Sequence, residues 1–358
     1  EFAAAAFSRT AEYDSAIASF LSRRLGSAFP ESLRIAYVKA TELRYGENPH
    51  QDAALYRDPA STGPTIVNSR QLHGKPLSYN NILDASSALE LAKDLRRLDG
   101  TKVGAVVVKH TNACGAATAD TSAAAVEAAL KGDPLAAYGG ILVVNRKVDK
   151  AAAEAMTGKD LFLEVVAAPD FDDDALEVLK SRWVNVRVLA VGDRAGSSAR
   201  KLSYRSVPGG MLVQDRDTRT AAPDQWEHAA GPAPDAMAIA DAAAVWTMCK
   251  HLNSNAIAIG GRDGRSGGAV RLFGAGAGER DRMTACRVAV EKAGANARGA
   301  IAASDAYFPF PDGPQILIDA GVTTLVHPGG SKRDQETFDL CDQRGVTCLV
   351  TGVRHFKH

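Results

Sequence analysis

Apolar runs of strand length alternate with segments of helical period along most of this chain, and this alternation constrains its fold more than any other feature. Six apolar runs predict strands at 103–108, 141–144, 162–167, 256–260, 324–326 and 347–351. Helices are predicted at 13–25, 84–98, 121–131, 173–182, 235–250, 282–293, 315–320 and 333–344, with Asp84 and Asp235 as N-caps. The alternation therefore predicts an α/β fold, or an α+β fold with mixed sheets.

Length and composition exclude several classes of protein. A chain of 358 residues is long enough for two or more cores. Lys plus Arg and Asp plus Glu both total 42, so the balanced charge gives no general attraction to nucleic acid or to a membrane surface. No apolar run reaches the roughly 18–20 residues needed to cross a bilayer.

The five cysteines are scattered, and no two are spaced as Cys-x-x-Cys. This pattern indicates neither a disulfide framework nor a zinc site, and it favours a reducing, cytoplasmic compartment. The chain begins Glu-Phe-Ala and has no signal peptide. We therefore expect a fragment of a longer product, or a chain whose first residues were removed.

Polar groups that could do chemistry follow the strand predicted at 103–108. Lys109, His110 and Asn112 bring a cation, an imidazole and an amide to a strand end, where ligands collect in open α/β sheets. The lysine could stabilise a phosphate or a developing oxyanion, and the histidine could transfer protons. A solvated lysine beside a capping histidine is the structural alternative.

Four other segments could contact a ligand. The loop at 44–51 combines Arg44 with a glycine and could clamp an anion, or it could be a rigid turn. Aromatic residues lie between prolines at 307–311, which suits a wall against a flat ligand. The glycine-rich segment at 274–282, which has neither a Rossmann nor a Walker spacing, could hold an anion or be a tight turn that packs against a partner. The segment at 327–331 could form a second anion nest, or Ser331 could cap the helix that follows.

The C-terminal tail and the middle of the chain bear on organisation. Arg354, Phe356 and His358 have period-two spacing, so an extended tail would place them on one face, tucked into a site. A loop at 195–199, a turn at 208–210 and a polar linker at 215–234 separate two halves. A short echo, Lys-His-x-Asn at 109–112 and again at 250–253, leaves duplication open.

Seven segments resemble, in the same order, the formyltransferase part of the bifunctional purine-biosynthesis enzymes. They are 43–51, 77–85, 108–115, 133–140, 254–257, 303–313 and 351–358. Those enzymes transfer a formyl group from 10-formyltetrahydrofolate to the 5-amino group of 5-aminoimidazole-4-carboxamide ribonucleotide (AICAR). The resemblance covers essentially the whole chain and implies the same reaction here, in the biosynthesis of IMP.

The resemblance also implies an architecture and partners. We expect two cytidine-deaminase-like α/β/α lobes, 1–205 with the N-terminal helix and the Arg-Tyr-Gly loop, and 206–358 with the active-site tail. We expect a cytoplasmic homodimer with the active site at its interface, no catalytic metal, and room for a structural potassium ion. IMP cyclohydrolase would lie in an N-terminal domain or on a separate chain, so that activity is not expected from these residues.

Site residues follow from the resemblance, position by position. The catalytic group would be Lys109, His110, Asn255 and the terminal His358. AICAR would be bound by Arg44, Tyr45, Asn81, Arg354 and Phe356. The folate would lie against Tyr138, Gly139, Tyr307, Pro309 and Asp312, and Glu164 is a looser match near the base of the site.

The chemistry explains these residue types. The 5-amino group is conjugated with the carboxamide-bearing imidazole, so it attacks poorly unless a base removes its proton. We expect His110 to take this role, helped by the substrate carboxamide. Lys109 and Asn255 would stabilise the tetrahedral oxyanion and the departing folate nitrogen, with no covalent intermediate.

One departure and two rival interpretations accompany the resemblance. Glu279 and Asp281 replace neutral residues of the family's glycine-rich turn, so no ligand contact is expected there. Zinc deaminases share the expected fold, but their His-x-Glu and Pro-Cys-x-x-Cys ligands are absent. A regulator that binds AICAR or folate without turnover would have no need for the Lys-His pair.

Overall fold

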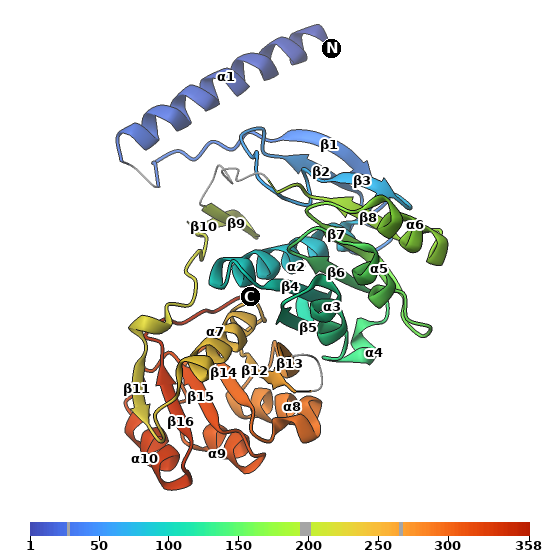
Figure 1. The fold of residues 1–358 in the computed structure, drawn as a ribbon. Helices are drawn as coiled ribbons and strands as arrows, with labels where there is room; N and C mark the ends of the chain where they lie inside the picture. Colours follow the sequence, from blue (N-terminus) through green and yellow to red (C-terminus); the bar gives the residue numbers. More distant parts are fainter. Residues whose placement is uncertain (27–28, 194–201, 265–267) are drawn as a thin grey trace.

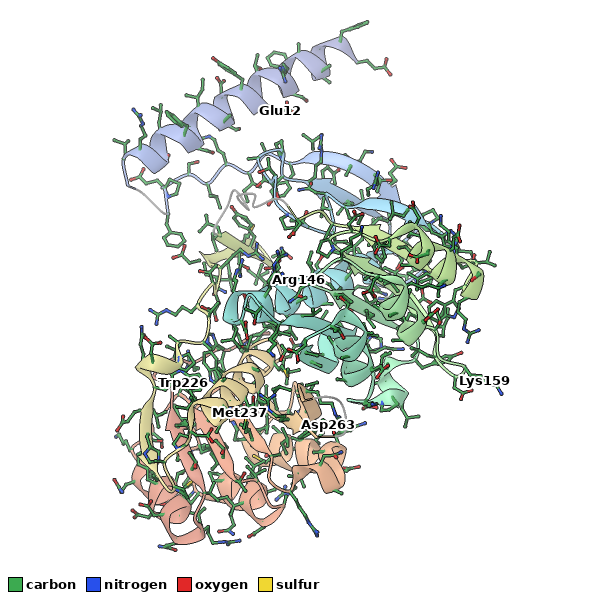
Figure 2. All side chains as sticks on the ribbon, in the orientation of Figure 1. Glu12, Arg146, Lys159, Trp226, Met237 and Asp263 are labelled. Atoms are coloured by element: carbon green, nitrogen blue, oxygen red, sulfur yellow. The ribbon has the colours of Figure 1, made fainter. Side chains whose placement is uncertain are left out.

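The computed structural model describes residues 1–26, 29–193, 202–264 and 268–358 (Figure 1). Helix α1 (Phe2–Arg24) is longer than the helix predicted at 13–25 and stands away from the rest of the chain. Figure 2 shows its side chains, Glu12 among them, projecting into open space. Among the helices of the described residues, none is both long and apolar enough to cross a membrane.

A twelve-stranded mixed sheet runs through the body of the molecule, which confirms the α/β prediction. Its order is β11-β16-β15-β14-β12-β13-β5-β4-β6-β7-β8-β3. The strands of the first half are β3 (Arg70–His73), β4 (Val103–Lys109), β5 (Asn112–Ala119), β6 (Gly140–Val144), β7 (Leu163–Ala168) and β8 (Arg187–Ala190). Those of the second half are β11 (Glu227–Ala230), β12 (Ile257–Asp263), β13 (Ala269–Gly276), β14 (Ile301–Ser304), β15 (Thr324–His327) and β16 (Thr347–Val350).

Helices cover both faces of this sheet and bury its alternating side chains. The long helices α2 (Tyr79–Leu98) and α7 (Ala236–Lys250) share one face, where Val106 and Val108 join their core. The opposite face is covered by α3 (Ser122–Leu130), α4 (Pro134–Ala137), α5 (Lys150–Met156) and α6 (Asp173–Arg182), and then by α8 (Arg282–Ala293), η2 (Gly294–Ala297), α9 (Asp312–Asp319) and α10 (Asp334–Arg344). The result is an α/β/α sandwich.

The two halves of the sheet repeat one topology. In each half, a helix precedes an antiparallel hairpin, and three further strands and an edge strand follow in the same spatial order. The halves join where β13 pairs with β5, at Val270 and Thr118. The Lys-His echo does not mark this repeat, because Lys109 ends a strand whereas Lys250 ends a helix.

The cytidine-deaminase likeness and the division into lobes at 205 and 206 stay predictions. That division falls inside β9 (Leu202–Val207), which forms a separate hairpin with β10 (Gly210–Asp215) around the predicted turn at 208–210. The halves also share one continuous sheet, so they are joined by more than a linker. The loop predicted at 195–199 lies outside the described residues.

Several strands escaped the sequence analysis because they are short, exposed and polar. Strands β1 (Val38–Leu43) and β2 (Ala53–Arg57) form a hairpin that carries the loop at 44–52. The predicted linker at 215–234 contains the turn η1 (Pro223–Gln225) and strand β11, which pairs with β16 at the edge of the main sheet. The linker prediction was therefore wrong for this edge.

Two further boundaries correct the predictions. Helix α2 begins at Tyr79, where Ser78 and Asn81 form a capping box, so Asp84 lies inside the helix and is not its N-cap. Gly274 and Gly276 belong to β13 instead of a turn. A Cβ on Gly276 would lie 2.1 Å from the Ala285 carbonyl oxygen, so the missing side chain lets α8 pack closely.

Candidate active site

His110 lies in the tight turn that joins β4 to β5. Its φ is 50° and that of Thr111 is 63°, a left-handed pair that costs non-glycine residues roughly 1–2 kcal/mol each. The Asp84 carboxylate of α2 accepts the amide hydrogens of His110 (3.3 Å) and Thr111 (2.7 Å). The helix thus holds the turn in its strained form, and Asp84 has a positioning role that the sequence analysis missed.

Lys109 reaches the neighbouring α4 turn. Its Nζ donates to the Tyr138 carbonyl at 2.7 Å. Gly139 follows with a φ of 70°, and a Cβ there would lie 3.2 Å from the same Nζ. The exposed Tyr138 ring packs against Phe162 with the ring centroids 5.8 Å apart. One lysine, one glycine and one open aromatic face therefore meet beside the His110 turn.

Asn255 lies just before β12, and each end of its side-chain amide makes one hydrogen bond. Its Oδ1 accepts from Arg282 at 2.9 Å, and its Nδ2 donates to the Glu279 carbonyl at 2.8 Å. Arg282 also pairs with the buried Asp305. The two acids that differ from the family's glycine-rich turn have structural roles. The backbone carbonyl of Glu279 binds Asn255, and Asp281 caps α8 by accepting the Thr284 amide hydrogen at 2.8 Å.

The His110 turn and the Asn255 segment are direct neighbours. The Oδ1 of Asn112 accepts the backbone N–H of Asn253 at 2.8 Å. Asn112 lies two residues after His110, and Asn253 lies two residues before Asn255. The end of β4 and the start of β12 therefore come together on one edge of the sheet.

The C-terminal tail lies near this edge with alternate side chains on opposite sides. The Arg354 guanidinium lies 4.3 Å from the Phe356 ring centroid, and the Phe356 and His358 rings are 5.7 Å apart. Phe356 and His358 line a cavity of about 730 Å³ with residues of α2, the end of α7 and the β9–β10 hairpin. Arg205 of that hairpin donates to the carbonyl of His358 at 3.0 Å.

A buried carboxylate forms part of the cavity wall. Asp94 accepts from Lys250 at 2.8 Å and from His251 at 2.9 Å. Burial opposes ionisation of Asp94, but the hydrogen bonds and charges of these two partners hold its pKa below the usual range. Burial lowers the pKa of His251. The second Lys-His pair is thus tied to a structural ion network.

The residues expected to bind the nucleotide lie around α2 and the β1–β2 loop. Arg44 donates to the Tyr45 hydroxyl at 3.3 Å and stacks 4.8 Å from its ring centroid. The loop contacts α2 where Asn80 donates to the Glu47 carbonyl at 3.4 Å. Asn81 accepts the Ser78 amide at 3.2 Å, so its side-chain oxygen serves the helix cap.

The remaining expected residues lie apart from His110. Tyr307 is exposed between β14 and α9, and Asp312 is the first residue of α9. Within the described ranges, no hydrogen bond or ring contact joins Tyr307, Pro309 or Asp312 to Lys109 or His110. Glu164 forms a half-buried ion pair with Arg187. One chain therefore brings together only part of the expected site.

The family comparison decides the affiliation. The family described as AICARFT/IMPCHase bienzyme matches residues 1–292. The chain belongs to this family. The bifunctional purine biosynthesis protein PurH of Rhodopirellula baltica is 42% identical over 362 residues, covering 100% of this chain and 67% of the relative. PurH of Oceanobacillus iheyensis is 39% identical, again with 100% and 67% covered.

These matches confirm the reaction inferred from the sequence, and the chain is an AICAR formyltransferase of purine biosynthesis. Among solved structures, form 1 of Acinetobacter baumannii RibD is 19% identical and covers 29% of this chain and 33% of its own. The TM-score of this match is 0.21, which is too low to indicate a shared fold.

The predicted anion nest of this formyltransferase at 327–331 is filled by its own chain. Asp334 accepts the amide hydrogens of Gly330 at 2.6 Å and of Ser331 at 3.0 Å. His327, which is 0% exposed, accepts the Gly329 amide on Nδ1 at 3.1 Å. Burial lowers the pKa of His327 to about 4, only partly opposed by Asp334.

This lowered pKa predicts acid destabilisation. Between pH 6.5 and about 4 the unfolded chain binds a proton at His327 and the folded chain does not. The free energy of unfolding should therefore fall as pH decreases through this window, by about 3 kcal/mol from this residue. Urea unfolding at several pH values should show a shallower pH dependence in His327→Gln. An unchanged slope would contradict this assignment.

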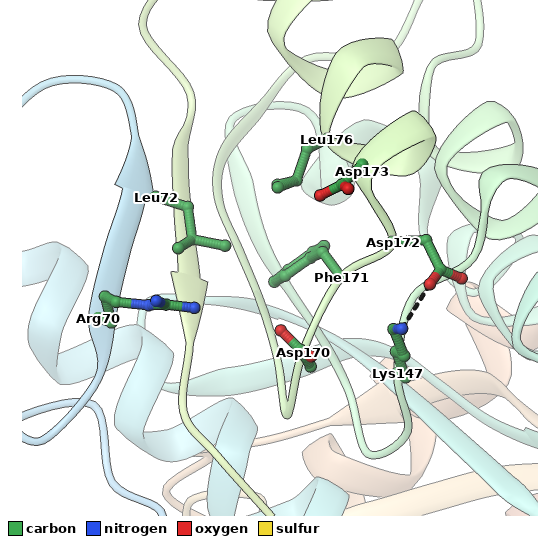
Figure 3. A pocket seen from close by; sticks show the side chains of 8 residues that line it. All are labelled: Arg70, Leu72, Lys147, Asp170, Phe171, Asp172, Asp173 and Leu176. Atoms are coloured by element: carbon green, nitrogen blue, oxygen red, sulfur yellow. Dashed lines mark ion pairs between the residues drawn. The ribbon is translucent and has the colours of Figure 1, made fainter.

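A second pocket of the formyltransferase, of about 340 Å³, lies at the opposite edge of the sheet (Figure 3). It follows the end of β7, where Phe171 lies beside the ion pair of Lys147 and Asp172. None of the expected site residues lines it. The residues expected to be catalytic lie instead at the edge where β4 ends and β12 begins.

Proposed function

We propose that Lys109, His110 and Asn255 perform the chemical step of AICAR formyl transfer at the edge where β4 ends and β12 begins. The proposal rests on the hydrogen bond from the backbone N–H of Asn253 to Oδ1 of Asn112, at 2.8 Å. This bond joins the segment that carries Lys109 and His110 to the segment that carries Asn255. The lysine and the imidazole lie on adjacent residues of one strained turn. A site for a proton transfer and an oxyanion is thereby held on rigid strands.

In this mechanism His110 takes the proton of the 5-amino group as nitrogen attacks the formyl carbon of 10-formyltetrahydrofolate. The Lys109 ammonium stabilises the tetrahedral oxyanion by its positive charge, and the Tyr138 carbonyl holds it in place at 2.7 Å. Collapse of the intermediate expels the folate nitrogen, which takes up the proton that His110 removed from the amino group. Arg282 polarises Asn255, whose amide orients the reacting groups.

AICAR would bind along the tail. Arg354, Phe356 and His358 form one stacked face, so an imidazole ring could lie against Phe356 while cations meet the phosphate. Arg44 and Tyr45 offer a second cation and hydroxyl on the β1–β2 loop, with Asn81 at the start of α2. Glu164 would lie near the base of the site.

The folate would lie against Tyr138 and Gly139 on one side and Tyr307, Pro309 and Asp312 on the other. Among the described residues, no hydrogen bond or ring contact joins these two groups, which supports a homodimer whose active site combines both subunits. We place this enzyme in the cytoplasm, because its scattered free cysteines favour a reducing compartment. A structural potassium ion and an associated IMP cyclohydrolase stay predictions from the resemblance.

Mixed dimers test this arrangement. His110→Ala and Asp312→Ala should each abolish most formyl transfer as homodimers. After co-expression, half of the dimers should be mixed, and each should have one intact site, so about a quarter of the wild-type rate should return. Sedimentation confirms the dimer. Dimers that recover no activity would place the complete site within one chain, and monomers would refute the homodimer.

A further inference from the structure

Lys357 connects the C-terminal tail to the two catalytic segments. Its Nζ donates to the Thr111 carbonyl at 3.1 Å and to the His251 carbonyl at 2.7 Å. Its backbone N–H donates to the Ser254 hydroxyl at 3.3 Å, and its carbonyl accepts the Ser254 amide at 2.8 Å. One residue therefore contacts the His110 turn, the end of α7 and the approach to Asn255.

The side chains of His355 and Lys357 alternate along the tail with those of Arg354, Phe356 and His358, and they are the less exposed ones. His355 is 3% exposed and packs 4.4 Å from the Trp246 ring, with Asp217 bound to its Nδ1. Lys357 follows two residues later and is half-buried. Burial lowers its pKa to about 8, so the ammonium form prevails at neutral pH and both carbonyls receive a charged donor.

The His110 turn is thus held from two directions. Asp84 takes the amide hydrogens of His110 and Thr111 from the side of α2. Lys357 of the tail, which lies 246 positions further along the chain, donates a hydrogen bond to the Thr111 carbonyl. If Lys357 leaves, only one of these two restraints remains on a left-handed pair that has no glycine.

We propose that Lys357 is a positioning residue for formyl transfer, which docks the C-terminal tail on the His110 turn so that the imidazole reaches its reactive position only when the tail is seated. The proposal rests on the role given to His110 above. It assigns a part to the tail residue between Phe356 and His358, whose ammonium binds the Thr111 and His251 carbonyls.

The test compares Lys357→Met, which keeps the apolar stem without the ammonium, with Lys357→Arg in the full chain. Formyl transfer by Lys357→Met should show a kcat lower by about 10- to 100-fold, the range for a displaced catalytic group. The KM for AICAR should rise in the same variant, because the loosened tail also carries Arg354, Phe356 and His358. Lys357→Arg should recover part of kcat. The matched control is Lys159→Met, since Lys159 is exposed and is labelled in Figure 2. This variant should keep the wild-type kcat.

A second readout follows the tail itself. Carboxypeptidase should release His358 faster from Lys357→Met than from the wild type. A folded Lys357→Met enzyme with wild-type kcat, or with an unchanged rate of release, overturns the proposal. If Lys357→Met does not fold, Lys357→Gln decides by the same two measurements. Loss of activity in His110→Ala but not in the Lys357 variants refutes this proposal alone, whereas an active His110→Ala refutes the proposed mechanism.

Discussion

Replacing His110 with alanine is expected to lower kcat for formyl transfer by about 10²- to 10⁴-fold, the usual contribution of a general base. The KM for AICAR should change little, because the imidazole acts on the amino proton and not on the bound ring or phosphate. The turn should survive, since Asp84 binds its backbone amides and not its side chains. Steady-state kinetics with both substrates measure the effects on kcat and on KM separately.

The matched control is His228→Ala, an exposed histidine of the edge strand β11. It should retain wild-type kcat and KM. If His110→Ala instead weakens AICAR binding while kcat stays normal, His110 is a binding residue and the proton must go elsewhere. The substrate carboxamide would then be the remaining acceptor in the mechanism.

Replacing Asp305 with alanine is expected to have the largest effect on stability. Its carboxylate, which is fully buried, binds Arg282, the Ser254 hydroxyl and the Ala256 amide. Removing it leaves the Arg282 guanidinium buried without a counter-charge, which typically costs about 3–5 kcal/mol. Because Arg282 also binds Asn255, kcat should fall in the same variant. Urea unfolding and formyl-transfer kinetics measure the two effects.

Asp319→Ala provides the comparison for this second prediction. It removes the carboxylate of an ion pair with Arg344 whose side chains are both largely exposed, so its unfolding midpoint should stay close to that of the wild type. Asp305→Asn, which keeps the hydrogen-bond geometry, should lie between the two. If Asp305→Ala is as stable as Asp319→Ala, the buried ion pair does not support the Asn255 segment.

The elements that could be predicted from the sequence are those with a local cause. Strands β4, β6 and β7 are buried on both faces and therefore read as continuous apolar runs. Helix α7 was recognised because Asp235 caps an alanine-rich segment. The hairpins β1–β2 and β9–β10 have mostly exposed or half-buried side chains, and so they lack the alternation that identifies a strand.

The site followed the same division. The period-two tail and the adjacent Lys109 and His110 were visible in the sequence, because each depends on neighbouring residues. Asp84 and Lys357 were missed because they bind backbone atoms of residues 27 and 246 positions away, respectively. Every residue except proline presents the same backbone carbonyl and amide, so such contacts leave no pattern in the sequence.

The placement of the last residue has a practical consequence for anyone handling this enzyme. The carbonyl of His358 is bound by Arg205, and its ring lines the large cavity. A purification tag fused after His358 would have to thread out through that cavity, and it would occupy space next to the proposed AICAR site. An extension before Glu1 would instead continue from the start of α1, which lies far from the C-terminal residue (Figure 1).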